Sequence, residues 1–365
     1  MKCLSTATSN QHSFTVSYLI NSCGFSQKAA LSASKCVNFN SPENADSVFA
    51  FLKSYGFSET QISMLIRRCP KVLGASPERT LLPKFEFFYS KGFSSPELVK
   101  ISSVCPEILF RSLENHIIPT FNYLIDLFKS SETVVNLVKQ APYILRHDVE
   151  TYIEPSINVL RDIGVPEQNI IMFLRFWSRP TKTRLSALKN TVEAVKEMGF
   201  NPLRSQFILA VVAKGHGKIN WESKVEIYRR WGWSEEEFLS AFQKSPLCMM
   251  ASDDKIMAIM DFLVNKMDME SSAIAKRPDI IVHSMGKTFI PRGAVYHFLL
   301  SKGLIKRKDT NLISLFKDSE KSFLRKFVNS YEEAPQLLKI YQEKLGISKM
   351  TKTSVSRERD NVIVK

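Results

Sequence analysis

The sequence predicts an all-α protein, an α-solenoid superhelix of about eight helix-pair repeats of 32–36 residues each. Three observations lead to this fold class. Prolines recur in pairs thirteen residues apart, glycines with bulky apolar neighbours recur at the repeat pitch, and the apolar residues between them follow the spacing of an amphipathic helix. Self-similarity with a period of roughly 20–50 residues is typical of proteins built from stacked structural units.

The proline pairs set the register of the repeat. Four pairs have the thirteen-residue spacing: Pro70 and Pro83, Pro106 and Pro119, Pro142 and Pro155, and Pro278 and Pro291. We expect the first proline of each pair to end a helix and the second to stand at the start of the next, where a first turn tolerates a residue without an N–H group. The short apolar segment after the first proline, such as "KVL" at 71–73, is interpreted as a turn or a single 3₁₀ segment that fills the core.

A glycine with bulky apolar neighbours marks the end of each repeat. This anchor is found at Gly24, Gly56, Gly92, Gly164, Gly199, Gly232 and Gly303, with Phe128 and Met267 filling the two gaps. The successive intervals are 32, 36, 36, 36, 35, 33, 35 and 36 residues. Glycine suits the left-handed residue that follows many helices. Helix-start signals come soon after it, namely the capping boxes that begin at Ser58, Ser94 and Ser234 and the prolines Pro166 and Pro202.

One helix pair cannot bury its apolar face alone, so neighbouring repeats have to stack into a continuous core. We therefore expect a helical-repeat domain over residues 13–345. Residues 1–12 form a short N-terminal extension, rich in Ser and Thr and free of acidic residues, which resembles a remnant of a transit peptide. Residues 346–365 lack a periodic apolar face and are predicted to be a flexible C-terminal tail. No apolar run approaches the ~20 residues of a membrane-spanning helix.

The charge of the chain favours a polyanionic partner. It carries 50 Lys and Arg against 36 Asp and Glu, a net charge of +14, and residues 175–308 alone hold 23 basic and 13 acidic side chains. Within this stretch cations recur just before the first-proline position, as Arg277 does before Pro278. Such cations either complement a helix dipole or form a stripe that follows a phosphate backbone. The aromatic residues of this stretch are candidates for base stacking or for core packing, and they include Phe176, Trp177, Trp221, Trp231 and Trp233.

Patterns for catalysis or metal binding are not found in the sequence. The six cysteines form no C-x-x-C pair, and the six histidines form no H-E-x-x-H motif. The segment "MGKT" at 285–288 lacks the first glycine of a phosphate-binding loop, because Ile281 stands at that position. We therefore predict a protein that is not an enzyme and that needs neither a cofactor nor a metal.

The repeated phrases resemble the mitochondrial transcription termination factor (mTERF) family, in particular its land-plant members. The likeness is carried by "CPKVL", "CPEIL", "APYIL" and "RPDII" after successive helices and by the spacers "SLENHIIP" and "TLLPKFEFF". The resemblance implies a left-handed helical-repeat superhelix with a basic concave surface, imported into mitochondria or alternatively chloroplasts. It also implies binding of organellar nucleic acid, with a role in transcription termination, gene regulation, or RNA processing such as intron splicing.

The resemblance places the nucleic-acid contacts among the basic residues of the later repeats. Carried over by position, they are Arg179, Lys182, Arg184, Arg229, Arg230, Arg277, Lys287 and Arg292. The expected partner is double-stranded DNA, RNA or both, bound by a monomer that does not engage a membrane. Two alternatives stay open. One is a pentatricopeptide-like array that binds single-stranded RNA, suggested by "TFNYLIDLF" at 120–128, and the other is a helical-repeat scaffold for protein partners.

Overall fold

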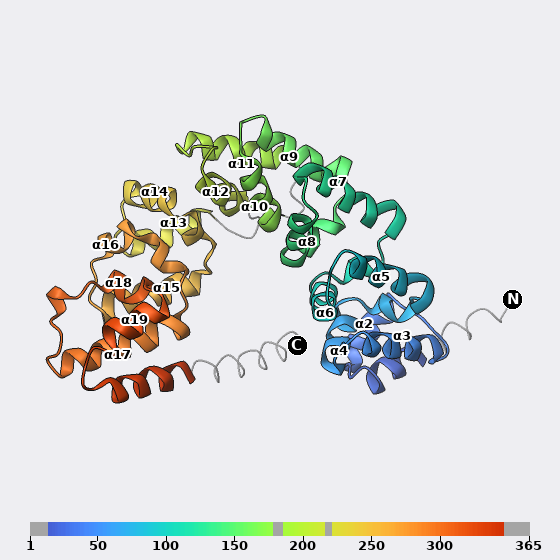
Figure 1. The fold of residues 1–365 in the computed structure, drawn as a ribbon, viewed down its shortest axis with the longest axis horizontal. Coiled ribbons are helices and arrows are strands. Elements are labelled where there is room, and N and C mark those ends of the chain that lie inside the picture. Colours follow the sequence, from blue (N-terminus) through green and yellow to red (C-terminus); the bar gives the residue numbers. More distant parts are fainter. Residues whose placement is uncertain (1–13, 178–184, 216–220, 347–365) are drawn as a thin grey trace. The chain divides into compact units, whose positions relative to one another are not determined.

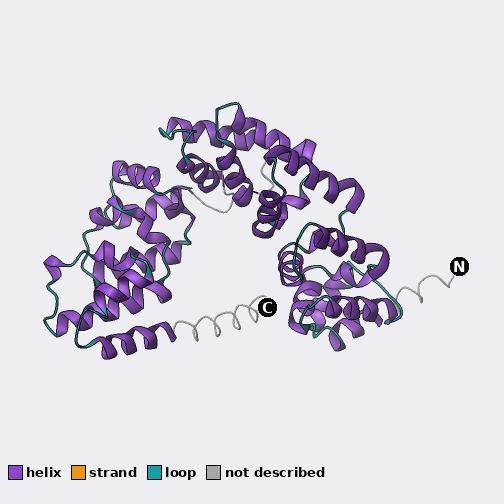
Figure 2. Cartoon of the chain, in the orientation of Figure 1, coloured by secondary structure: helices purple, strands orange, loops and turns teal. Residues whose placement is uncertain are grey.

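The computed structural model describes residues 14–177, 185–215 and 221–346 of the chain. These residues form helices joined by short connections, and no strand occurs among them (Figures 1 and 2). The prediction of an all-α fold is thereby confirmed. Contacts divide the chain into two units, unit 1 up to residue 182 and unit 2 from residue 183 onward, and each is described by itself.

Unit 1 begins with a helix at residues 14–21 and continues with short helices that alternate with 3₁₀ and π-helical segments (Figure 1). Its α-helices are α2 (Gln27–Ala33), α3 (Glu43–Ser54), α4 (Glu59–Arg68), α5 (Leu82–Ser90), α6 (Ser95–Val104), α7 (Ile118–Phe128), α8 (Ser131–Gln140), α9 (Glu154–Arg161) and α10 (Glu167–Trp177). Its 3₁₀ helices are η1 (Pro70–Gly74), η3 (Pro106–Leu109) and η5 (Pro142–Arg146), and its π-helical turns are η2 (Pro77–Leu81), η4 (Leu113–Ile117) and η6 (Val149–Ile153).

Unit 2 shows the same alternation from residue 235 onward and ends with a helix at residues 334–346. Its α-helices are α11 (Leu185–Glu197), α12 (Ser205–Gly215), α13 (Trp221–Arg230), α14 (Glu235–Lys244), α15 (Asp253–Asp261), α16 (Ser271–Lys276), α17 (Ile290–Ser301), α18 (Leu312–Lys317) and α19 (Glu320–Phe327). Its 3₁₀ helices are η7 (Pro246–Met250), η9 (Pro278–Val282) and η11 (Arg307–Asp309), and its π-helical turns are η8 (Phe262–Lys266) and η10 (Met285–Phe289).

The apolar segment after the first proline of each pair is a short 3₁₀ helix whose side chains enter the core. In η1 the proline opens the helix and both Val72 and Leu73 are buried. In η9 Ile280 and Ile281 are buried in the same way. Of the two forms left open by the sequence, a turn or a single 3₁₀ segment, the structure shows the second. Burial of two branched apolar side chains contributes about 1.5–3 kcal/mol each, so these short helices join the core of each repeat.

The second proline of each pair stands in the first turn of its α-helix, as predicted, but a π-helical turn that was not predicted precedes that helix. Pro83 lies in the first turn of α5, but η2 precedes α5 without a break, so the helical segment begins at Pro77. The Leu82 N–H donates to the Pro77 carbonyl, which is the wide spacing of a π turn. A proline within an α-helix lacks one N–H and presses on the carbonyl four residues earlier, and a wider turn gives the ring more room. Pro119, Pro155 and Pro291 follow π-helical turns in the same manner.

The glycine anchors adopt the expected left-handed conformation. All seven have a positive φ, between 67° and 89°. In the two gaps the left-handed residue is Lys129, with φ 51°, and Asp268, with φ 54°, so each anchor falls one residue later than Phe128 and Met267. Asp268 gains a partner in this strained position, because its carboxylate lies 2.9 Å from Nη2 of Arg307. The repeat pitch therefore persists where glycine is absent.

Helix starts follow the capping signals of the sequence. The Ser58 hydroxyl accepts the Gln61 N–H at 3.3 Å, and the Gln61 side chain accepts the Ser58 N–H at 2.8 Å. Ser234 and Glu237 exchange the equivalent bonds at 3.1 Å each. Each cap satisfies N–H groups that no helical carbonyl reaches and contributes about 1 kcal/mol.

Side chains of one repeat bind carbonyl groups at the end of the next 3₁₀ helix. The Asn44 amide donates to the Leu73 carbonyl at 2.7 Å, and the Lys255 ammonium donates to the Val282 carbonyl at 2.8 Å. His116 Nε2 lies 2.8 Å from the Leu145 carbonyl. Buried carbonyls without a partner cost about 1–3 kcal/mol each. This recurring contact, which the sequence did not reveal, ties neighbouring repeats together beyond their apolar packing.

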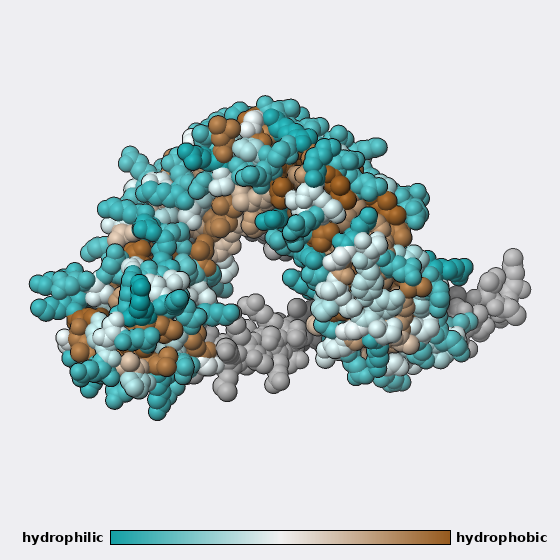
Figure 3. All heavy atoms as spheres, in the orientation of Figure 1, coloured by the Kyte–Doolittle hydropathy of each residue, from teal (hydrophilic) through white to brown (hydrophobic). Residues whose placement is uncertain are grey.

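The surface of each unit is mainly polar. In the view of Figure 3 hydrophilic residues cover most of the visible surface, with hydrophobic patches between them. The large apolar side chains that are exposed come from separate elements, and the most exposed are Leu203 at 61% and Met64 at 54%. Single exposed apolar residues are ordinary. Within the described residues, no helix combines the length and apolarity that crossing a membrane requires.

Candidate nucleic-acid interface

The basic side chains of unit 1 are largely engaged within the fold. Arg67 and Arg68 donate to the backbone carbonyls of Gly24 and Ser103, at 2.8 and 2.6 Å. Other cations form ion pairs with carboxylates, and these pairs are Lys53–Glu59, Lys139–Glu97, Arg146–Glu107 and Arg161–Glu167. These side chains are therefore held by partners within unit 1, several of them in a neighbouring repeat.

Unit 2 places cations at the C-terminal ends of three neighbouring helices. Lys244 is the last residue of α14, Lys276 is the last residue of α16, and Lys317 is the last residue of α18. Helix α14 packs against α16, η7 packs against η9, and α18 packs against η9. Because η7 and η9 directly follow α14 and α16, these contacts bring the matching helix ends side by side. We call Lys244, Lys276, Arg277 and Lys317 the cationic edge.

Two members of the cationic edge are open to solvent. Lys244 and Lys276 are exposed, and neither forms an ion pair with a carboxylate of the described residues. Packed helices lie about 8–10 Å apart, whereas a nucleic-acid strand advances about 3.4 Å per nucleotide. Successive cations of the edge therefore match roughly every third phosphate of one strand. The other two members, Arg277 and Lys317, both contact the Asp279 carboxylate.

Five of the eight residues selected from the sequence lie in the described parts of the chain, where their environments differ. Arg179, Lys182 and Arg184 lie outside the described residues. Arg229 and Arg230 are exposed in the last turn of α13, and both lie near the Glu226 carboxylate, at 3.1 and 3.6 Å. Lys287 is exposed in η10 and forms no ion pair with a described carboxylate. Arg277 follows the end of α16, and 53% of its side chain is exposed.

Arg292 is placed differently from the other four that lie in the described residues. It is only 6% exposed, and its Nη1 donates to the carbonyls of Leu315 at 2.9 Å and Asp318 at 2.8 Å. The guanidinium also lies over the Phe323 ring, 4.7 Å from its centroid. Its burial lowers its pKa. A guanidinium held in this way joins α17 to the two following helices and is not presented to a ligand.

Lys224 is a second buried cation, which the sequence reasoning did not single out. It is 5% exposed, and its ammonium contacts the Ala251 carbonyl and the Asp253 carboxylate. It lies eight residues before Gly232, as Lys84 lies eight before Gly92, and Lys84 is also buried. This shared register was the signal that could have identified Lys224 as a core residue.

The aromatic residues of unit 2 mostly pack within the core. Trp233 is 3% exposed and stacks on Tyr228 with ring centroids 4.5 Å apart. Trp221 packs edge-on against Phe242 at 4.9 Å. Trp231 is half-buried, and its Nε1 donates to a methionine sulfur at 3.3 Å. Of the two roles left open by the sequence, packing is the one that the geometry of Trp221 and Trp233 supports.

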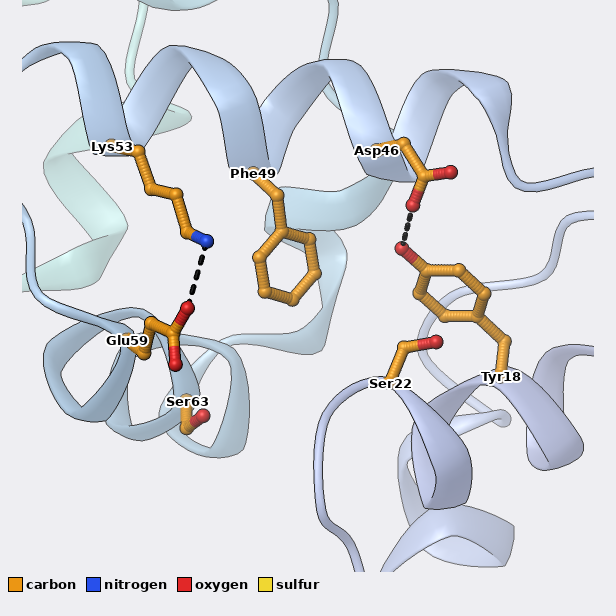
Figure 4. Close-up of a pocket in the computed structure, with 7 residues that line it drawn as sticks. All are labelled: Tyr18, Ser22, Asp46, Phe49, Lys53, Glu59 and Ser63. Carbon is orange, nitrogen blue, oxygen red and sulfur yellow. Dashed lines mark hydrogen bonds and ion pairs between the residues drawn. The ribbon is translucent and has the colours of Figure 1, made fainter.

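Unit 1 contains a small pocket of about 340 Å³ between the helix at 14–21, α3 and α4 (Figure 4). Its charged groups are paired with one another. The Tyr18 hydroxyl donates to Asp46 at 2.5 Å, and Lys53 pairs with Glu59 at 2.8 Å (Figure 4). Burial and the neighbouring Asp46 raise the pKa of Tyr18. With two carboxylates and one ammonium group, this pocket is not suited to a phosphate.

Two buried cysteines and the grouping of potential metal ligands can be assessed in the part of the chain that the structure describes. Burial raises the pKa of both Cys105 and Cys248 to about 12, so these thiols stay protonated near neutral pH. Among the residues that the structure describes, no group of three or more His, Cys, Asp or Glu side chains converges on one point.

Comparison with known proteins gives one family. The family model described as mTERF matches residues 49–215 and 216–324, which together make up more than half of the chain. No curated protein matches the chain.

Proposed function

Because the chain belongs to the mTERF family, we propose that it regulates the expression of an organellar genome by binding nucleic acid through unit 2. Proteins of this family are generally organellar, non-enzymatic nucleic-acid binders that regulate gene expression. Family membership thus supports the class of ligand. The charges of the chain itself support the location in unit 2.

The observation that carries this location is the cationic edge. Its cations stand at matching ends of helices that pack in succession, so their spacing is set by the repeat and not by flexible loops. Phosphate contacts supply most of the sequence-independent affinity for nucleic acid. In unit 1 several cations, Arg67, Arg68, Lys139 and Arg146 among them, are engaged by carbonyls or carboxylates, which leaves fewer charges for this purpose.

The proposed contact set includes the exposed members of the edge and the exposed cations selected from the sequence. It consists of Lys244, Lys276, Arg277, Lys287, Arg229 and Arg230, together with Arg179, Lys182 and Arg184. Arg292 is left out of this set because its donors already bind two carbonyls in the core.

The proposal extends to a specific setting. The ligand is double-stranded DNA, RNA or both. The organelle is the mitochondrion, with the chloroplast as the alternative. The protein belongs to the land-plant type of the family and acts as a monomer. Its effect is on transcription termination or regulation, or on RNA processing such as intron splicing. The repeat phrases quoted from the sequence support this setting by their likeness to the land-plant members of the family.

Binding of the full chain to fluorescent nucleic acid across a sodium chloride series tests the proposal. The probes are a 30-base-pair duplex DNA and a single-stranded RNA of matching sequence. For the duplex, the slope of log affinity against log salt concentration should become shallower by about 0.9 for each phosphate contact that is lost. We call this slope the salt slope. The triple variant Lys244→Gln, Lys276→Gln and Arg277→Gln should therefore flatten the slope by roughly 2–3.

A triple variant of unit 1 provides the matched control. Lys28→Gln, Lys35→Gln and Lys100→Gln change the net charge by the same amount at exposed positions. Their salt slope should equal that of the unaltered chain. Equal losses in both triple variants would refute the location in unit 2. Binding of neither probe, or binding insensitive to salt, would refute nucleic acid as the ligand and favour protein partners.

A further inference from the structure

Asp279 lies between two cations of the cationic edge. Its carboxylate contacts the Lys317 ammonium and lies 3.7 Å from Nε of Arg277. The two cations come from different repeats, because Arg277 follows α16 and Lys317 ends α18. One carboxylate thus joins the ends of two neighbouring helices.

The surroundings of this carboxylate are those of a site for an anion. Burial and the neighbouring Arg277 lower the pKa of Lys317, so the two cations repel each other in the absence of negative charge between them. Both are helix-terminal residues, and Arg277 keeps 53% of its side chain exposed. A phosphate oxygen makes the same charge-assisted hydrogen bonds to guanidinium and ammonium groups that a carboxylate oxygen makes.

We propose that Arg277 and Lys317 form a phosphate-binding site between neighbouring repeats, and that Asp279 fills this site in the free protein and limits affinity for nucleic acid. The proposal rests on the proposed function and adds to it a contact residue, Lys317, and a residue that opposes binding. Asp279 is itself 39% exposed at its side chain, so it can rotate into solvent when a phosphate enters. The pair is part-buried, and 21% of the Lys317 side chain is exposed, so the ammonium keeps an open side toward solvent.

Unit 1 contains an arrangement in the same register, which serves as an internal control. Glu107 follows Pro106 as Asp279 follows Pro278, and it pairs with Arg146 of the next repeat at 3.4 Å. The Arg146 guanidinium also lies over the Tyr143 ring at 5.9 Å, and its backbone carbonyl accepts from Arg111. Neutralising Glu107 therefore changes the net charge equally, but away from the cationic edge.

The experiment compares Asp279→Asn with Glu107→Gln in the full chain, using the duplex DNA and RNA probes across the salt series. Asp279→Asn should bind about three- to tenfold more tightly near 0.15 M salt, with a salt slope steeper by roughly 1–2 because up to two cations become free. Glu107→Gln should match the unaltered chain. Adding Lys317→Met to Asp279→Asn should remove most of the gain, and thermal melts of every variant establish that unit 2 stays folded.

The outcomes separate this proposal from the one on which it rests. If the unaltered chain binds with a steep salt slope but Asp279→Asn binds no better than it, the Asp279 proposal alone is refuted. An equal gain in affinity in Glu107→Gln would show that the effect depends on net charge alone, and it would refute the Asp279 proposal as well. If Lys317→Met leaves the gain intact, Lys317 is not the contact. Salt-insensitive binding by the unaltered chain overturns both proposals.

Discussion

Arg292 offers the sharpest test of how charge is used in this chain, because it was selected from the sequence as a ligand contact and lies in the core. The substitution Arg292→Met keeps a long apolar side chain and removes the donors. It abolishes two hydrogen bonds from a charged group, to Leu315 and Asp318, and the contact with the Phe323 ring. We expect unit 2 to lose stability while phosphate contacts are unaffected.

The magnitude follows from the contacts. Hydrogen bonds from a charged donor contribute about 1.5–3 kcal/mol each, and a partly desolvated cation–π contact contributes about 0.5–2 kcal/mol. The substitution by methionine recovers part of this free energy, because the desolvation cost of burying a charge, several kcal/mol, is no longer incurred. Its two carbonyl partners are neutral, and the nearby carboxylates of Asp318 and Glu320 lose a favourable interaction with its charge when the arginine is removed. The net loss should be about 2–4 kcal/mol.

Thermal unfolding and the binding assay together read out the result. For a unit of this size about 2–4 °C is lost per kcal/mol, so the melting temperature should fall by roughly 4–16 °C. The melting temperature of Arg292→Lys should fall less than that of Arg292→Met, since lysine keeps the charge but not the forked donor geometry. The salt slope for duplex DNA should be unchanged in both. A variant that melts like the unaltered chain and loses about 0.9 from its salt slope would refute this account.

Two further predictions concern packing and thiol reactivity. Gly293→Ala should lower stability by about 1–3 kcal/mol, because a Cβ atom there would lie 2.7 Å from Cζ of Phe262. Gly346→Ala, which meets nothing within 4 Å, is the control, and equal melting temperatures for the two variants would contradict the reasoning. Iodoacetamide at pH 8 should label the exposed Cys36 in the native protein and Cys248 only after unfolding, as judged by mass spectrometry. The pKa of Cys248 is raised to about 12, so raising the pH to 9 should not make it reactive.

The parts of the fold that were predictable are those fixed by local chemistry. A proline that ends a helix, a glycine with positive φ and a serine that caps an N-terminus each act within a few residues. The start of α5 beside Pro83 was predicted, but the π turn before it was not, because a proline in a first turn does not indicate the form of the turn that precedes it.

The candidate interface was predictable only in part, because the environment of a cation depends on the next repeat. The position after the second proline is buried in every repeat that has one, as shown by Lys84, Thr120, Ser156 and Arg292. Thr120 and Ser156, small residues at this position, were a sign of limited space. The pairing of Asp279 with Lys317 spans 38 residues and has no signature in sequence spacing.

The position before the first proline shows how such a scaffold can carry charge without changing its backbone. Cys105 and Ala141 occupy it in unit 1 and are buried, whereas Arg277 occupies it in unit 2 with most of its side chain exposed. The backbone angles are nearly the same, φ −131° and ψ 73° at Cys105 and φ −134° and ψ 61° at Arg277. A long side chain can leave such a position with its stem against apolar neighbours and its charge in water. The following proline fixes the backbone here, so the length of the side chain decides whether its end reaches water. The proposed phosphate contacts of unit 2 therefore require no departure from the backbone of the repeat.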